Sequence, residues 1–367
     1  MIFQWQLFVL LIVIALFAPA MNMYREVNVY GNEQIRYNWF PVLVLAIPMI
    51  YMAGTRSETL PNVGDTMSYL GMFQAAPTSL SELFSSFTED SKDKGFSVFM
   101  TLVKAVVGNR EIVFFTIIAA VCILCVMAVY RKYSCNFIIS AFLFIASGEY
   151  IQWAYNGIRQ FIPVAILFAC IGLILKKKYI PFIILTLILS TIHASALLMI
   201  PMVFIVQGRA WNRKTMLLII AVIIAIASLE QFTDLVTGIM ENTQYSGEVD
   251  QYLSTEGTSL QRVLVYSIPA ILSLILKRRI DRENNPVINL AANMALITAL
   301  TYLLSAFTSG IFLGRIPIYF SLYNYILLPW LIEHCFTKNS ARLIYLALIG
   351  FYLLFYYFQM HVTWNLG

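Results

Sequence analysis

The chain has 367 residues, of which 60% are hydrophobic and 12% charged, and its formal net charge is +5. A soluble globular domain carries roughly 25% charged residues, so the composition excludes that class and indicates an integral membrane protein. The positive charge does not require nucleic acid, because membrane proteins gather Lys and Arg on cytoplasmic loops. The five cysteines match no zinc-site spacing and there are three histidines, so no metal or cofactor is predicted.

Long apolar runs predict an all-α, polytopic fold of about twelve transmembrane helices in a single membrane domain, 1–367. An apolar core at Leu7–Phe17 precedes Ala18-Pro19-Ala20, which resembles a cleavage site, but no Lys or Arg precedes it. The first helix is therefore expected to be retained. The predicted spans lie near 3–20, 39–53, 111–130, 135–153, 157–175, 179–192, 195–207, 215–232, 260–276, 286–306, 311–334 and 341–358.

The run Tyr179–Gln207 decides the predicted topology. As one helix it would be about 43 Å long, against a hydrocarbon core of about 30 Å. A hairpin that turns at His193–Ser195 instead places the basic clusters on either side of the run on one face. With both chain ends outside, 16 of the 24 basic residues then lie inside, which satisfies the positive-inside rule. The eight outer ones are Arg56, Lys92, Lys94, Lys104, Arg110, Arg159, Arg262 and Arg315.

Two outer segments are long. In the first, 54–110, the stretch Gly95–Gly108 is too short to span a membrane. Its apolar face (Phe96, Phe99, Val103, Val106) opposes Ser97, Thr101 and Lys104, which predicts a helix lying in the membrane interface. The second segment, 232–259, is acidic and is expected to be the variable, substrate-shaped part.

Three arginines lie at or near membrane depth on the predicted outer side: Arg56, Arg159 and Arg315. Charges at such depth are costly and usually face protein or water, although each side chain could also reach lipid headgroups. Arginine stays charged and binds phosphate oxygens with a planar fork of donors. A shared site for a lipid-linked diphosphate is therefore predicted, with Arg159 and Arg315 catalytic and Arg56 binding substrate.

Carboxylates and a histidine near the same surface are candidates for proton transfer. Asp65 is the first candidate for a general base and His193 the second, while Asp65 could instead pair with Arg56. Glu149 could bind substrate or pair with an arginine. His193 could equally make a structural hydrogen bond with Ser195. The predicted substrate-binding residues are completed by Thr66 and Tyr69, which follow Asp65 closely in the sequence, and by Gln160, which follows Arg159.

Taken in order, these residues resemble the EpsG family of bacterial membrane proteins, related to the Wzy-type polysaccharide polymerases. The resemblance rests on Arg56, Val63-Gly64-Asp65-Thr66 with Tyr69, Lys94-Gly95-Phe96, Gly157-Ile158-Arg159-Gln160, Ile192-His193-Ala194-Ser195-Ala196, and Gly314-Arg315 with Tyr319-Phe320. The family often has Glu-Pro-Gly-Phe where this chain reads Asp93-Lys94-Gly95-Phe96, a departure that weakens any role for the preceding loop residues.

The resemblance implies a glycosyltransferase-type polymerase of exopolysaccharide, O-antigen or biofilm matrix at the outer face of the bacterial cytoplasmic membrane. The donor would be a glycan on undecaprenyl diphosphate, and the acceptor a sugar hydroxyl on a second lipid-linked repeat unit. Other implied partners are membrane lipids and other polysaccharide-assembly membrane proteins, with no nucleic acid.

Two other functions are compatible with the sequence. A lipid-linked oligosaccharide flippase should have broken helices and polar groups near mid-membrane. The middles of the predicted spans are nearly all apolar, which favours surface chemistry over passage. A non-catalytic membrane subunit of a polysaccharide assembly complex is the third possibility.

Overall fold

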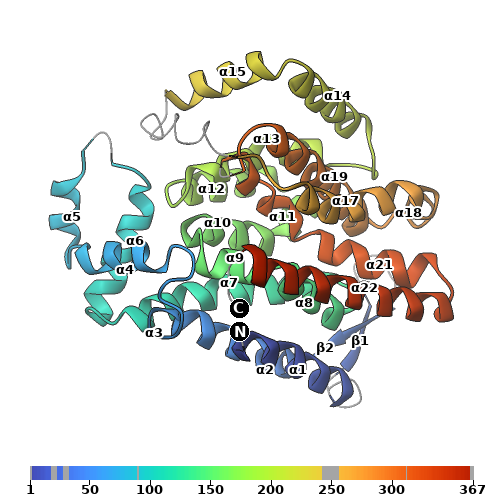
Figure 1. Ribbon diagram of the computed structural model, residues 1–367, viewed down its shortest axis with the longest axis horizontal. Helices are drawn as coiled ribbons and strands as arrows, with labels where there is room; N and C mark the ends of the chain where they lie inside the picture. The colour runs from blue at the N-terminus through green and yellow to red at the C-terminus, as the bar shows by residue number, and fades with distance from the viewer. Residues whose placement is uncertain are drawn as a thin grey trace.

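The structure is a computed structural model that describes residues 2–17, 23–27, 33–88, 91–241, 256–310 and 312–363 (Figure 1). The prediction of an all-α fold is confirmed, and every predicted span contains at least one helix. The first half comprises α1 Ile2–Phe17, α2 Trp39–Gly54, α3 Arg56–Thr59, α4 Thr66–Ala75, α5 Leu80–Ser86, α6 Lys94–Val107, α7 Glu111–Tyr133, α8 Phe137–Ala146, α9 Glu149–Tyr155, α10 Ile158–Ala169 and α11 Ile171–Leu175. The second half comprises α12 Tyr179–Ser190, η1 Ala194–Leu198, α13 Met199–Ile205, α14 Arg213–Ala227, α15 Leu229–Glu241, α17 Leu260–Ile275, α18 Lys277–Glu283, α19 Pro286–Phe307, η3 Leu313–Arg315, α20 Ile318–Ser321, α21 Asn324–Cys335, α22 Lys338–Phe358 and η4 Gln359–Thr363.

The number of predicted spans is not confirmed. By length and composition, three described helices can cross a membrane alone: α7, α19, and α22 with the residues that follow it to Val362. Three bent helix pairs raise the number to at most six if each pair is one span. Several other apolar runs form helices that are too short, such as α10 and α12 with 12 residues each. A single helix needs about 20 residues to cross the hydrocarbon core.

Three of the apolar runs form bent helix pairs rather than continuous helices. The axes of α8 and α9 differ by 61°, those of α14 and α15 by 101°, and those of α17 and α18 by 65°. The break between α8 and α9 falls at Gly148, whose φ of 82° is strained for any residue with a side chain. The next residue, Glu149, is buried. A second glycine with positive φ, Gly157, separates α9 from α10.

The centre of the fold is built around α7, which packs against α2 and α10 (Figure 1). Its sequence suits a long helix, because Glu111 lies in the first turn, and Arg131 and Lys132 lie in the last, where each complements the helix dipole. On the other side of the molecule α17 and α19 pack together. Helices α3 to α6 extend to one side of this core, and α14 with α15 lies across its upper edge in Figure 1.

A small antiparallel hairpin, β1 Met23–Val27 with β2 Glu33–Tyr37, occupies a stretch for which the sequence indicated only an inner loop. It is attached to the end of α7. Arg36 donates from Nη1 to the carbonyl of Ser134 at 2.7 Å. Arg131 donates from Nε to the carbonyl of Tyr37 at 2.8 Å. The hairpin therefore supplies an acceptor for Arg131 and a donor, Arg36, to this helix end.

The predicted amphipathic helix exists as α6, but its faces are not used as expected. Thr101 and Lys104, assigned to the polar face, are buried, whereas Val106 is 85% exposed. The Lys104 ammonium donates to the carbonyls of Gln74 and Ala76, each at 2.6 Å. Because these carbonyls lie at the end of α4, the lysine acts as a C-terminal cap. Helix α6 thus buries Phe96 and Val103 of its apolar face together with Lys104 of its polar face.

The acidic segment 232–259 begins as helix rather than loop, because α15 continues to Glu241. Its middle part, 242–255, lies outside the described residues. From Glu256 the chain returns to the fold: Gly310 donates its N–H to the carbonyl of Glu256 at 3.0 Å, and Thr258 donates to the carbonyl of Ser305 at 3.1 Å. These bonds place the start of α17 beside the end of α19.

Candidate functional site

The turn Val63–Thr66 docks on the linker between α9 and α10. Thr66 is buried, and its hydroxyl donates to the carbonyl of Val63 at 2.7 Å, which closes the turn. Gly64 has a φ of 58°, and a Cβ at this position would lie 2.7 Å from the carbonyl oxygen of Tyr155. Only glycine therefore allows the turn to approach this closely. The predicted substrate-binding residue Thr66 shapes the turn through this bond.

Asp65 is held by this turn against the start of α10. Its Oδ2 accepts a hydrogen bond from the N–H of Gly157 at 3.3 Å. A carboxylate at a helix N-terminus is favoured by the helix dipole. No ion pair joins Asp65 to Arg56 in the part of the chain that the structure describes, so the predicted pairing is not formed. The Oδ1 of Asp65 makes no hydrogen bond recorded among these residues, and it is available for proton transfer.

Arg159 lies in the first turn of α10 and forms an ion pair with Asp93, with Nη1 and Oδ2 2.9 Å apart. The arginine side chain is 31% exposed and the aspartate side chain 2%. Asp93 precedes α6 with a φ of 47°, a conformation that Asp tolerates better than most residues. The ring of Tyr69 lies 5.9 Å from the guanidinium of Arg159, and burial raises the pKa of this tyrosine.

Asp93 is the site residue that the sequence reasoning missed. Its run was dismissed because it departs from Glu-Pro-Gly-Phe, yet aspartate keeps the carboxylate of the glutamate it replaces. Gly95, two residues further on, is also fixed. Gly95 donates its N–H to the carbonyl of Thr191 at 2.8 Å, and a Cβ on Gly95 would clash with the Thr191 side chain. The α6 start and the His193 turn are therefore in contact.

Gln160 connects the two candidate catalytic arginines. It is buried, and its Nε2 donates to the carbonyl of Arg315 at 3.0 Å. Since Gln160 follows Arg159 directly, this bond ties the start of α10 to the short helix η3. The side chain of Arg315 is half-buried and forms no ion pair with any described residue. Gln160, predicted to bind substrate, is placed as a positioning residue.

The predicted hairpin turn at His193–Ser195 is present after α12, with His193 as the N-cap of η1 and Ser195 in its first turn. His193 Nδ1 lies 2.7 Å from the hydroxyl of Ser195, which lies 3.0 Å from the hydroxyl of Tyr319. Burial first, and the charges of Arg159 and Arg315 next, lower the pKa of His193 to about 3. The imidazole is therefore neutral over the physiological range, and the expected hydrogen bond with Ser195 is observed.

Two predicted residues lie deeper. Arg56 is 2% exposed, donates from Nη1 to the carbonyl of Ala154, and stacks over Phe115 at 3.9 Å from the ring centroid. Burial lowers its pKa to about 10. Glu149 accepts hydrogen bonds from Trp153 Nε1 and Ser321 Oγ, both at 2.6 Å. Neither side chain is in direct contact with the Asp93–Arg159 pair.

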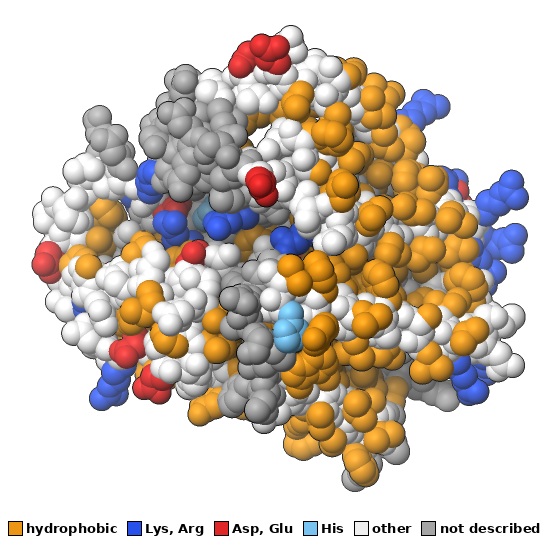
Figure 2. Space-filling model, in the orientation of Figure 1, with side chains coloured by type: hydrophobic (Ala, Val, Ile, Leu, Met, Phe, Trp, Pro, Cys, Tyr) orange, Lys and Arg blue, Asp and Glu red, His pale blue; other side chains and the backbone are white. Residues whose placement is uncertain are grey.

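Five segments far apart in the sequence therefore meet in one cluster: 63–69, 93–95, 155–160, 191–195 and 315–319. Figure 2 shows basic, acidic and histidine side chains gathered in a hollow left of centre, with further basic side chains at the right edge and hydrophobic surface between. The cluster offers fixed guanidinium groups, a carboxylate and neutral hydroxyl and imidazole groups. Such a set can bind a phosphate-bearing ligand and accept a proton from a hydroxyl.

The apolar helices and this arginine-containing cluster define a helical membrane protein with a polar site assembled from distant segments. The particular family follows from the sequence, because the model of the EpsG family matches residues 37–365, nearly the whole chain. The chain belongs to the EpsG family, which indicates a membrane protein of polysaccharide synthesis. No curated protein and no solved structure matches it.

Proposed function

We propose that this protein polymerises oligosaccharide repeat units linked to undecaprenyl diphosphate, at the outer face of the bacterial cytoplasmic membrane. The observation that carries the proposal is the bond from Gln160 to the carbonyl of Arg315. Because Gln160 directly follows Arg159, this bond holds two half-buried arginines in the same cluster. Arg159 is partly neutralised by Asp93, whereas Arg315 has no ion-pair partner among the described residues. An anionic ligand would complete this pair of cations.

The reaction needs stabilisation where charge develops. The hydroxyl oxygen of the acceptor sugar forms a bond to the anomeric carbon of the donor, and the bond from that carbon to the diphosphate oxygen breaks. The electron pair leaves with undecaprenyl diphosphate, and the hydroxyl proton passes to a base. Glycosyl transfer of this kind has an oxocarbenium-like transition state. Arg159 and Arg315 would stabilise the departing diphosphate, because fixed cations act strongly in a site from which water is excluded.

Asp65 is the proposed base. One of its oxygens is occupied by the Gly157 amide, which fixes the carboxylate, and the other is available to a hydroxyl. Tyr69 lies next to Arg159 and would contact the ligand that Arg159 binds. His193 is neutral and bonded within its turn, so it is placed second for this role. Membrane lipids and other assembly proteins are proposed partners.

The test uses purified protein reconstituted into lipid vesicles with isolated undecaprenyl diphosphate-linked repeat units. Polymer length is resolved by size on a gel. Arg315→Lys keeps the charge but not the planar fork, and it is expected to lower the rate about 10²–10³-fold, the cost of removing one stabilising donor. Arg110→Lys changes an exposed arginine before α7 that takes no part in the cluster; it is the matched control and should retain full activity. Equal rates in both variants would contradict the proposal.

Transport of lipid-linked oligosaccharides is the second candidate function. It is favoured by one observation, the bent α8–α9 pair with the buried carboxylate of Glu149 at the break, a feature expected in transporters. A deletion strain separates the two functions. Single repeat units that accumulate outside the membrane indicate a polymerase, whereas the same units retained inside indicate a flippase.

A further inference from the structure

A separate cavity of about 260 Å³ lies at the start of α17, away from the Asp93–Arg159 pair. Its walls come from three parts of the chain: 257–262, Gly310, and the end of α22 with Gln359. Small-molecule pockets typically measure about 300–1,000 Å³, so this cavity has room for one sugar ring rather than a chain of sugars. None of the roles proposed above uses it.

Arg262 supplies the charge of this cavity. Its Nη2 donates to Oε1 of Gln359 at 3.2 Å, and it forms no ion pair with any described residue. Gln359 is itself buried, and a Cβ on Gly148 would lie 3.2 Å from the same Oε1, so the amide is held firmly behind the arginine. A neutral amide occupies one of the five guanidinium donors. The remaining donors suit a carboxylate, which guanidinium binds through two parallel hydrogen bonds.

The other walls suit the remainder of a sugar. Phe355 and Phe358 line one side, and Phe358 is 38% exposed. Thr258 and Ser259 also line the cavity and are its small polar residues. A pyranose presents apolar faces and polar edges, and it therefore matches a pocket with aromatic surface and a small number of hydrogen-bonding groups.

The cavity and the Arg315 site share a wall. The Ser305 hydroxyl donates to the hydroxyl of Thr258 at 2.8 Å, and a Cβ on Gly314 would lie 2.7 Å from the same oxygen. Gly314 directly precedes Arg315. A sugar in the cavity would therefore lie on the far side of Thr258 from the proposed diphosphate site, as an enzyme that joins two lipid-linked sugars requires.

We infer that this cavity binds a carboxylate-bearing sugar, a uronic acid, of the acceptor unit, with Arg262 holding the carboxylate and Phe358 the apolar face. The assignment to the acceptor rests on the proposed polymerase function, whereas the binding of an acidic sugar does not. Glycan chains that lack an acidic sugar would be poorer acceptors.

Binding is measured by ligand-observed NMR on the purified full chain in detergent, with methyl glucuronide and its uncharged counterpart methyl glucoside as probes. The glucuronide should bind more tightly than the glucoside. Arg262→Gln should weaken glucuronide binding about ten- to a hundredfold, the range for a lost charged hydrogen bond. Arg262→Lys should weaken it less, and Phe358→Ala should weaken both sugars. Arg110→Gln is the control and should change neither. Thermal unfolding of every variant verifies that it is folded.

Three results would overturn the inference. The first is equal binding of the two sugars, and the second is unchanged glucuronide binding by a folded Arg262→Gln variant. The third is tighter binding of inorganic phosphate than of the glucuronide at this cavity. Phosphatidylglycerol that displaces the glucuronide would identify a lipid-headgroup site instead. If the proposed polymerase function is wrong, the pattern differs: glucuronide still binds through Arg262, but no polymer forms from any lipid-linked unit. Conversely, polymer formation with an unchanged acceptor KM in Arg262→Gln rejects the cavity as the acceptor site.

Discussion

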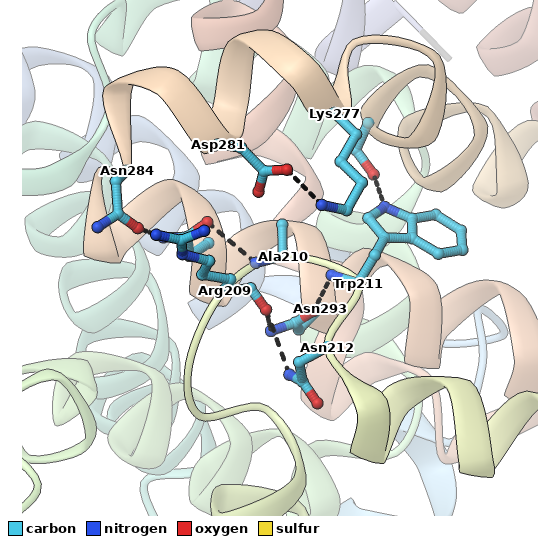
Figure 3. Close-up of polar contacts among 10 residues, drawn as sticks. Arg209, Ala210, Trp211, Asn212, Lys277, Asp281, Asn284 and Asn293 are labelled. Carbon is cyan, nitrogen blue, oxygen red and sulfur yellow. Dashed lines mark hydrogen bonds and ion pairs between the residues drawn. The ribbon is translucent and has the colours of Figure 1, made fainter.

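Two polar regions of this protein use their hydrogen bonds in opposite ways. In the loop 206–212, neutral asparagine side chains are bonded to the loop backbone, beside an ion pair of Lys277 with Asp281 (Figure 3). Asn293 of α19 accepts from the N–H of Trp211 at 2.8 Å and donates to the carbonyls of Val206 at 2.9 Å and Arg209 at 3.2 Å. Asn289 accepts from the N–H of Ala210 at 3.0 Å. The asparagines supply the partners that the irregular loop backbone lacks.

The arginine cluster differs because one of its cations, Arg315, is not in an ion pair with any described residue. Arg159 shares one carboxylate while remaining partly exposed. A half-buried cation without a partner costs desolvation energy that no ion pair repays. The neutral asparagines of the loop do not carry this cost. The comparison agrees with a structural role for the asparagine network and with the proposal that the arginine cluster binds a ligand.

The largest expected effect is a difference in thiol labelling from outside the cell, because the two regions should lie on opposite sides of the membrane. In a cysteine-free background, Arg110→Cys should react with an impermeant thiol reagent added to intact cells, and Arg213→Cys should not. Both positions are exposed, so access depends on the side of the membrane. Labelling of Arg213→Cys in intact cells would place the asparagine network outside and reject the predicted hairpin topology.

Removal of the proposed base should be the next largest effect. Asp65→Asn keeps an oxygen that can accept from the Gly157 amide but cannot take a proton, so the polymerisation rate should fall roughly 10²–10⁴-fold. The double variant with Arg56→Gln should recover no activity, because Asp65 and Arg56 form no ion pair. Recovery in the double variant would show that the two residues act on each other and would leave His193 as the base to test.

The asparagine network should respond in the opposite sense. Asn293→Ala leaves the N–H of Trp211 and two carbonyls without their partner, at about 1–3 kcal/mol for each buried group left unsatisfied. The midpoint of thermal unfolding in detergent should fall clearly, while the rate per folded molecule stays near that of the wild type. Asn285→Ala, which removes only the N-cap of α19, is the milder control at about 1 kcal/mol. A stable but inactive Asn293→Ala would remove the distinction between the two regions.

The positions of the helices could be predicted from the sequence because apolar runs are long and strongly hydrophobic. Their breaks could not: Gly148 and Gly157 end helices through positive φ angles, which single residues in an apolar run do not reveal. The cluster was found through Arg159, Arg315 and Asp65, which stand out as polar residues in apolar surroundings. Asp93 was missed because its run departs from the family pattern, and its ion pair joins it to Arg159, more than sixty residues further along the chain. Contacts of that range follow from packing rather than local pattern.

The smallest effect is expected at His193, and it separates a structural role from a catalytic one. With its pKa lowered to about 3, against an ordinary value of about 6.5, the imidazole stays neutral at any pH well above 3. The polymerisation rate should therefore show no ionisation of this group between pH 5 and 8. His193→Asn can still accept from the N–H of Ser195, a bond of 3.4 Å in the native turn, and should lower the rate less than tenfold. The measurement is the rate against pH for the wild type and this variant. A wild-type profile with an inflection near 6.5 that disappears in His193→Asn would contradict this prediction. It would make the histidine a titrating catalytic group whose pKa is not lowered by burial and the two arginines.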